Sequence, residues 1–223
     1  MKNVLITGAT GGIGSSILKL FYNNNYNICV TGTNMDKLNE IEVNYKGKVK
    51  CISCNLNDAL EIESLVQQSN EYYGSTDILI NNAGITKDNL FLRMKDEEWN
   101  DVINVNLNSN FKLTKQILKG MIKSRWGRII NISSDAAKIG NAGQANYVAS
   151  KSAIEGLTRT LANEVASRGV TVNCVSPGFV DTEILETIDE KTLQNMAERI
   201  PLGRMGRIDE IASAVYFLSS EES

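Results

Sequence analysis

The chain has 223 residues, with 23 lysines and arginines against 26 acidic residues, so its formal net charge is −3. This slightly acidic balance argues against a nucleic-acid-binding protein or a protein of anionic membrane surfaces, and no apolar run approaches the roughly 18 residues of a membrane span. The length predicts one domain over residues 1–223.

Short apolar segments alternate with longer amphipathic ones along the whole chain. The apolar segments predict strands buried on both faces, as in a parallel sheet that helices cover on both sides. Their alternation with helices predicts a doubly wound α/β fold of the Rossmann type. The expected strands span residues 3–7, 27–32, 48–54, 77–81, 127–133 and 170–176, and the expected helices span residues 13–24, 36–45, 58–73, 96–123, 147–167, 188–199 and 208–219.

The first expected strand runs into a glycine-rich turn, TGATGGIG, from Thr7 to Gly14. Gly8, Gly12 and Gly14 allow a tight turn, a close approach of the backbone to a pyrophosphate, and close packing of helix on strand. A glycine pattern alone is a weak signal, but its place between a strand and a helix favours a dinucleotide site over an ordinary glycine-rich turn.

The second expected strand leads into TGTN, residues 31–34, which holds no acidic side chain. An acid there would bind the ribose of NAD and repel the 2′-phosphate of NADP. The neutral segment therefore favours NADP, with Thr33 and Lys37 as candidate phosphate contacts. We interpret Asp36 as the N-cap of the next helix rather than as a ribose ligand.

Cys51 and Cys54 form a C-x-x-C pair at the third expected strand. Such a pair can serve redox chemistry or hold a metal, but residues three apart in a strand point to opposite faces. The chain has no histidine and no second C-x-x-C pair to complete a zinc site, so we expect structural cysteines and no metal. Four cysteines in a chain of this size indicate a reducing compartment, and Met1 leads so directly into the first strand that we expect no signal peptide and a cytoplasmic protein.

Tyr147 and Lys151 lie four residues apart in QANYVASKSA, so on a helix they share one face. A chain without histidine needs another acid or base near neutral pH, and a nearby ammonium group lowers the pKa of a tyrosine from its usual value of about 10. By itself the pattern also fits a packed aromatic and a solvated lysine. Ser134 follows an expected strand, at the edge where open α/β sheets bind ligands.

These motifs, together with NNAG (residues 81–84) and PG (177–178), follow the order of the short-chain dehydrogenase/reductase family, which essentially the whole chain resembles. Within it, NNAGITKDNLFLRMKDEEW and GNAGQANYVASKSA are similar to 3-oxoacyl-[acyl-carrier-protein] reductases of type II fatty acid synthesis. The resemblance implies NADPH-dependent reduction of a 3-oxoacyl thioester carried on acyl carrier protein. A reductase of acyl-CoA or another small keto substrate, and a non-catalytic cofactor-binding relative, are the alternatives.

The resemblance also implies roles for single residues. Tyr147 donates the proton, Ser134 polarises the substrate carbonyl, Lys151 binds the nicotinamide ribose, and Asn106 holds a water that relays protons to the lysine. Ser133, the neighbour of Ser134, is expected to pack or cap. Many NADP-using relatives carry an arginine in the glycine loop where this chain has glycine. The implied cofactor contacts are Gly8, Thr10, Gly12, Ile13, Gly14, Thr33, Asn55, Leu56, Asn82, Ala83, Gly84, Tyr147, Lys151, Pro177, Gly178, Val180 and Thr182.

Two further expectations concern partners. The resemblance implies docking of the acyl carrier protein at Arg125 and Arg168, which would otherwise be ordinary solvated charges near helix C-termini. It also implies a homotetramer that uses the helices expected at 96–123 and 147–167. Family members continue past the position of Ser223 with one more strand. We therefore expect six parallel strands, the sixth being an exposed apolar edge.

Overall fold

The computed structural model describes residues 1–182, 193–194 and 197–223. Within these residues one six-stranded sheet has the order β3-β2-β1-β4-β5-β6, and every strand pair is parallel. The predicted doubly wound fold and its six parallel strands are confirmed, with β6 at the edge of this sheet. The strands are β1 (Asn3–Thr7), β2 (Asn27–Gly32), β3 (Val49–Ser53), β4 (Ile78–Asn81), β5 (Gly127–Ile132) and β6 (Val170–Val175).

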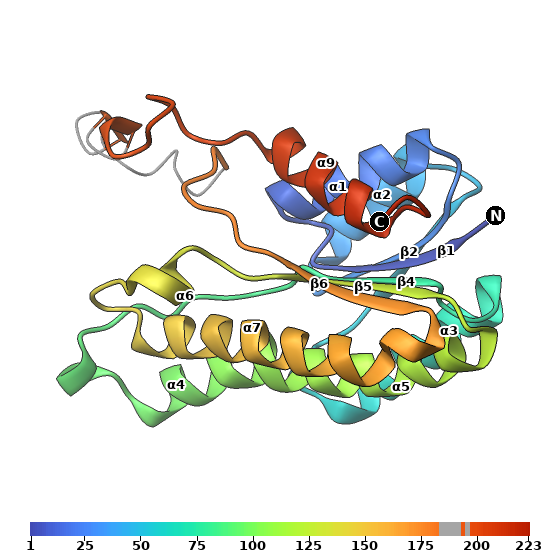
Figure 1. The fold of residues 1–223 in the computed structure, drawn as a ribbon, viewed down its shortest axis with the longest axis horizontal. Helices are drawn as coiled ribbons and strands as arrows, with labels where there is room; N and C mark the ends of the chain where they lie inside the picture. Colours follow the sequence, from blue (N-terminus) through green and yellow to red (C-terminus); the bar gives the residue numbers. More distant parts are fainter. Residues whose placement is uncertain (183–192, 195–196) are drawn as a thin grey trace.

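Helices cover both faces of the sheet (Figure 1). Successive strand side chains point to opposite faces, so a strand that is apolar at every position fills two cores at once. In β1, for example, Val4 and Ile6 belong to one core and Leu5 to the other. The first core includes α1 (Gly12–Asn23), α2 (Met35–Asn44) and α9 (Ile208–Ser219), and the second includes α3 (Ala59–Tyr73), α5 (Ser109–Ser124) and α7 (Ala145–Val165).

The helix expected at 96–123 is interrupted. It consists of α4 (Asp96–Ile103), the π-helical turn η2 (Asn104–Asn108) and α5. Periodicity misses this turn because the apolar residues before it and after it still recur at helical spacing, so a single inserted turn leaves the stretch reading as one helix. The short elements η1 (Phe91–Arg93), α6 (Ala136–Ile139) and η3 (Ala166–Arg168) were likewise not expected, and most of the helix expected at 188–199 lies outside the described residues.

The interpretation of Asp36 as an N-cap is wrong. The side chain of Asn34 caps α2, since its Oδ1 accepts a hydrogen bond of 3.0 Å from the backbone N–H of Lys37. Asp36 is the second residue of the helix and points to solvent. Asn and Asp are nearly equal as N-caps, so their order in the sequence did not decide between them.

The C-x-x-C pair behaves as expected of structural cysteines. Cys51 packs against the first core and Cys54 belongs to the second, so the two point to opposite faces. Burial raises the pKa of each thiol to about 11, which keeps both protonated near neutral pH. No cluster of metal-ligating side chains occurs among the described residues, and none of the helices described is both long and apolar enough to cross a bilayer.

Candidate active site

A cleft of about 860 Å³ lies over the carboxyl ends of the strands. This is the edge at which open α/β sheets bind ligands, because the loops there diverge from the sheet. Ser134 lines this cleft, and so does every cofactor contact that the family resemblance implies: Gly8, Thr10, Gly12, Ile13, Gly14, Thr33, Asn55, Leu56, Asn82, Ala83, Gly84, Tyr147, Lys151, Pro177, Gly178, Val180 and Thr182. Lys37, the other candidate phosphate contact, does not line it.

The glycine loop is folded so tightly at Gly8 and Gly14 that neither position has room for a side chain. A Cβ on Gly14 would lie 2.2 Å from the carbonyl oxygen of Gly8, and Gly8 itself has φ +66°. Asn82 holds the loop from below, since its Nδ2 donates to the carbonyl oxygens of Thr7 (2.9 Å) and Gly8 (3.1 Å). The Asn82 side chain therefore fixes the shape of the glycine loop, and Asn82 also lines the cleft.

Lys151 is 4% exposed, and its Nζ donates to the carbonyl oxygen of Ile132 at 2.7 Å. A Cβ on Gly84 would lie 3.3 Å from this Nζ and 3.4 Å from Oδ1 of Asn106. Glycine in NNAG thus lets the lysine and the asparagine converge beside one backbone position. Burial lowers the pKa of Lys151 to about 8, since a buried ammonium loses its hydration.

Asn106 lies in the π-helical turn η2 and is 3% exposed. Its Oδ1 accepts from the backbone N–H of Ile85 (2.8 Å), and its Nδ2 donates to the Ile85 carbonyl (3.0 Å) and to Oγ of Ser150 (3.1 Å). Every hydrogen-bonding direction of the amide is therefore specified except one lone pair of Oδ1. Such π-helical turns are frequent at functional sites.

Tyr147 and Ser134 both line the cleft, and the two side chains are close enough for Ser134 to influence the pKa of the Tyr147 hydroxyl. Burial is the largest influence on Tyr147 and raises its pKa, and the neighbouring Ser134 side chain lowers it only in part. The Nζ of Lys151 lies 5.6 Å from the Tyr147 ring centroid. The expected lowering of the Tyr147 pKa by this lysine is therefore wrong for these residues, since loss of hydration dominates both groups.

The chain was compared with known proteins. The family model described as short chain dehydrogenase matches residues 2–193. The chain is 44% identical to the 3-oxoacyl-[acyl-carrier-protein] reductase FabG of Vibrio harveyi, over 100% of this chain and 91% of that protein. Proteins of the same name from Escherichia coli (strain K12) and Salmonella typhimurium are each 43% identical, with the same coverage.

The chain belongs to the short-chain dehydrogenase family. Membership implies an oxidoreductase with a nicotinamide dinucleotide, NAD or NADP. The residues present fit such a cofactor. The N-terminus of α1 at Gly12 has no side-chain cap, so its backbone N–H groups remain for a pyrophosphate beside Gly8 and Gly14, where a Cβ does not fit.

The segment after β6 forms the remaining wall of the short-chain dehydrogenase cleft. Pro177, Gly178, Val180 and Thr182 line it, and Val180 pairs with Gly206 in an isolated parallel bridge. Residues far apart in the chain are thereby joined at the rim of the cleft.

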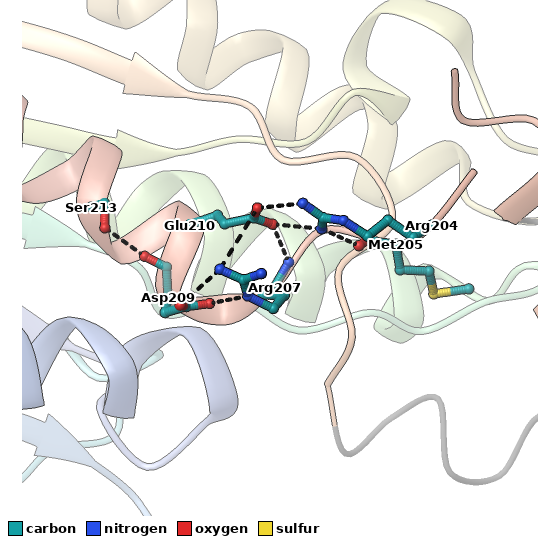
Figure 2. Close-up of polar contacts among 6 residues, drawn as sticks. All are labelled: Arg204, Met205, Arg207, Asp209, Glu210 and Ser213. Atoms are coloured by element: carbon teal, nitrogen blue, oxygen red, sulfur yellow. Dashed lines mark hydrogen bonds and ion pairs between the residues drawn. The ribbon is translucent and has the colours of Figure 1, made fainter. Parts of the chain in front are cut away.

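Next to Gly206, ion pairs fasten the chain to the start of α9 (Figure 2). Arg204 donates to both carboxylate oxygens of Glu210, at 2.6 and 3.0 Å, and Glu210 accepts the backbone N–H of Arg207 at 2.8 Å. Arg207 in turn pairs with Asp209 at 2.9 Å. We call Arg204, Arg207, Asp209 and Glu210 the α9 ion cluster.

The two docking candidates lie elsewhere. Arg125 ends α5 in the left-handed conformation, and its guanidinium donates to the Ser167 carbonyl at 3.1 Å, next to Arg168. Each arginine lies two residues before the start of a strand, Arg125 before β5 and Arg168 before β6, whereas the cleft is formed where strands end. The two arginines are adjacent to each other, but they lie at the amino ends of the strands, whereas Tyr147 lies at the carboxyl ends.

Two residues of the site were missed from the sequence. Ser150 holds Asn106, and Glu155 accepts hydrogen bonds from Ser133 and Ser176. For Glu155 a signal existed, because it follows Lys151 by one helical turn as Lys151 follows Tyr147. Ser133 is buried and packs against α7, as expected.

Proposed function

We propose that this short-chain dehydrogenase is a 3-oxoacyl-[acyl-carrier-protein] reductase that uses NADPH. The observation that carries the proposal is the convergence of Ser134, Tyr147 and Lys151 in one cleft, in a chain 43% identical over its whole length to reductases of that name. A binding module has no need for a buried lysine beside a half-buried tyrosine, because burying an ammonium group opposes folding.

The roles of the chain's own groups follow from their chemistry. The bound cofactor supplies the hydride that reduces the C3 ketone. Ser134 donates a hydrogen bond to the ketone oxygen, and Tyr147, with its raised pKa, holds a proton that it transfers to that oxygen as charge develops. Lys151 binds ribose hydroxyls and replaces the tyrosine proton through water held near Asn106.

The preference for NADPH is supported by the surroundings of Thr33. No acidic side chain occupies the end of β2, and Thr33 lines the cleft. The half-buried side chain of Lys37 folds back from α2 so that its Nζ lies 3.5 Å from the carbonyl oxygen of Thr10 in the glycine loop. An ammonium between α2 and this loop suits the 2′-phosphate of NADP.

The acyl carrier protein is proposed to dock at Arg125 and Arg168, because carrier proteins are acidic and these arginines adjoin each other. A strand of six residues such as β5 is about 20 Å long, so this docking place is about that far from the cleft of the same chain. We propose that a carrier bound there serves the cleft of a second copy within a homotetramer.

The test is oxidation of NADPH and of NADH, measured with acetoacetyl-CoA and with acetoacetyl-[acyl-carrier-protein]. We expect NADPH oxidation with both thioesters, a lower KM for the carrier-linked substrate and weaker activity with NADH. Activity confined to a non-thioester ketone would contradict the proposed substrate, and a preference for NADH would contradict only the proposed cofactor.

A further inference from the structure

Glu155 occupies an unusual place for a carboxylate. It lies on α7 one turn after Lys151, and its Oε1 accepts hydrogen bonds from Oγ of Ser176 (2.9 Å) and Oγ of Ser133 (3.3 Å). None of the ion pairs found among the described residues involves Glu155. A partly buried carboxylate that relies on hydroxyl donors is a costly way to stabilise a fold, so another reason for its presence is expected.

The two serines connect Glu155 to both neighbouring strand ends. Ser133 follows β5 and directly precedes Ser134, and Ser176 follows β6 and directly precedes Pro177. Both Ser134 and Pro177 line the cleft. One carboxylate oxygen thus ties the loops that carry two walls of the cleft to the helix that carries a third.

Ser133 strengthens this connection. Its hydroxyl also lies 3.2 Å from the backbone carbonyl of Lys151, and its backbone N–H donates to the carbonyl of Val175 at 2.8 Å. A serine hydroxyl has a single proton, so the carbonyl of Lys151 and the carboxylate of Glu155 share it. The turn of α7 between these two residues is therefore held against β5 at two points.

The charges of Glu155 and Lys151 act in one shared environment. Burial is the largest cause of the raised pKa of the Cys174 thiol, on β6. The negative charge of Glu155 raises this pKa further, and the positive charge of Lys151 lowers it. Glu155 is thus electrostatically close to the site, although it does not line the cleft.

We infer that Glu155 is a positioning residue for the catalytic groups. Its carboxylate, through Ser133 and Ser176, sets the distance between Ser134 on the β5 loop and Tyr147 with Lys151 on α7. The inference rests on the reductase activity proposed above. Since displacement of a reacting group by about 1 Å can cost on the order of 100-fold in rate, loss of this tie affects turnover more than binding.

The test compares Glu155→Ala, Glu155→Gln and Ser176→Ala with the wild-type protein in NADPH-dependent reduction of acetoacetyl-CoA. Glu155→Ala is expected to lower kcat at least about 10-fold, while the Kd for NADPH, measured by its fluorescence, changes less than about twofold. Glu155→Gln keeps an acceptor oxygen and is expected to retain most of the turnover. Glu164→Ala, which removes an exposed carboxylate from the same helix, is the matched control and leaves kcat unchanged.

The double variant Glu155→Ala/Ser176→Ala separates positioning from general destabilisation. If the two side chains act as one tie, the double variant is no slower than Glu155→Ala alone, whereas independent effects multiply. Unchanged kcat in Glu155→Ala and Ser176→Ala, or fully multiplicative losses, would overturn the inference. If Glu155→Ala does not fold, the decision falls to Ser176→Ala, which must lower kcat without raising the Kd. Wild-type protein inactive on every thioester would instead overturn the proposed function, and this inference with it.

Discussion

Two groups of charged residues in this molecule are held in opposite ways. Lys151 is buried beside the cleft, bonded to a backbone carbonyl, and its pKa is lowered to about 8. The α9 ion cluster is exposed to solvent and fully paired, and the pKa of Glu210 is lowered to about 2 by hydrogen bonds from Arg204 and from the backbone of Arg207. Both environments hold charged groups in place. The surroundings of Lys151 disfavour its charged form, whereas the α9 ion cluster favours the charged form of Glu210.

The difference separates chemistry from attachment. Burial makes Lys151 release its proton more easily and opposes folding at neutral pH, which is acceptable where a reaction needs the group. Exposed ion pairs contribute little to stability and serve here to fix the direction of the chain at the start of α9. We expect changes near Lys151 to have large effects on turnover and changes in the α9 ion cluster to have small ones.

The largest effect is expected for Tyr147→Phe. The substitution removes the proton donor but keeps the ring, so turnover falls at least about 100-fold while the Kd for NADPH stays nearly constant. Tyr72→Phe, at a half-exposed tyrosine outside the cleft, is the control. Near-normal reduction of a 3-oxoacyl thioester by Tyr147→Phe would remove the tyrosine from the mechanism.

Lys151→Met is expected to abolish turnover and to stabilise the cofactor-free protein. The folded-state pKa of about 8 lies below the ordinary 10.5, so the unfolded chain binds the proton more tightly, and the burial penalty is complete below pH 8. That penalty is about 3 kcal/mol and is lost as the pH rises toward 10.5. Because the Ile132 carbonyl loses its donor, the net gain at pH 7 is about 2 kcal/mol in urea unfolding.

The pH dependence tests the cause of this gain. The stability difference between Lys151→Met and the wild-type protein should shrink between pH 8 and pH 10, whereas Lys46→Met, at an exposed lysine, should show no such change. A gain that is constant with pH would mean that the substitution acts by packing alone.

Charge reversal at Arg125 and Arg168 is expected to weaken recognition of the acyl carrier protein without changing the chemistry in the cleft. Arg125→Glu with Arg168→Glu should raise the KM for a carrier-linked thioester about 10-fold at low salt, because the acidic carrier is repelled, and leave the KM for acetoacetyl-CoA unchanged. Lys19→Glu with Lys46→Glu changes the net charge equally at exposed sites and is the control. Equal losses on both substrates would exclude docking at these arginines.

The smallest effect is expected for Glu210→Gln. Since the folded-state pKa of Glu210 is depressed, its stabilising contribution is present above about pH 4.5 and is lost as the pH falls toward 2. We expect urea unfolding to show a slight loss of stability at pH 7 that disappears near pH 2. The kcat of the variant should be unchanged. A loss as large at pH 2 as at pH 7 would show that the charge is not involved.

The sequence by itself determined the layers and the cofactor edge. Strand segments that are apolar at every position can be buried only between two helical layers, and a Cβ at Gly8 or Gly14 of TGATGGIG would collide with the backbone. These are local properties of the residues. The family resemblance supplied the cofactor contacts, and all of the assigned cofactor residues except Lys37 border the cleft.

Only the tertiary structure decided the environment and the relative positions of the catalytic groups. The raised pKa of Tyr147 depends on burial, which no spacing reveals, and the orientation of the Asn106 amide depends on hydrogen bonds with Ile85 and Ser150 that it makes from a π-helical turn. The tie through Glu155 joins α7 to the ends of β5 and β6, contacts between residues about 20 positions apart. Loss of hydration and long-range hydrogen bonds arise from the packing of whole elements, which is why the residue pattern alone did not contain them.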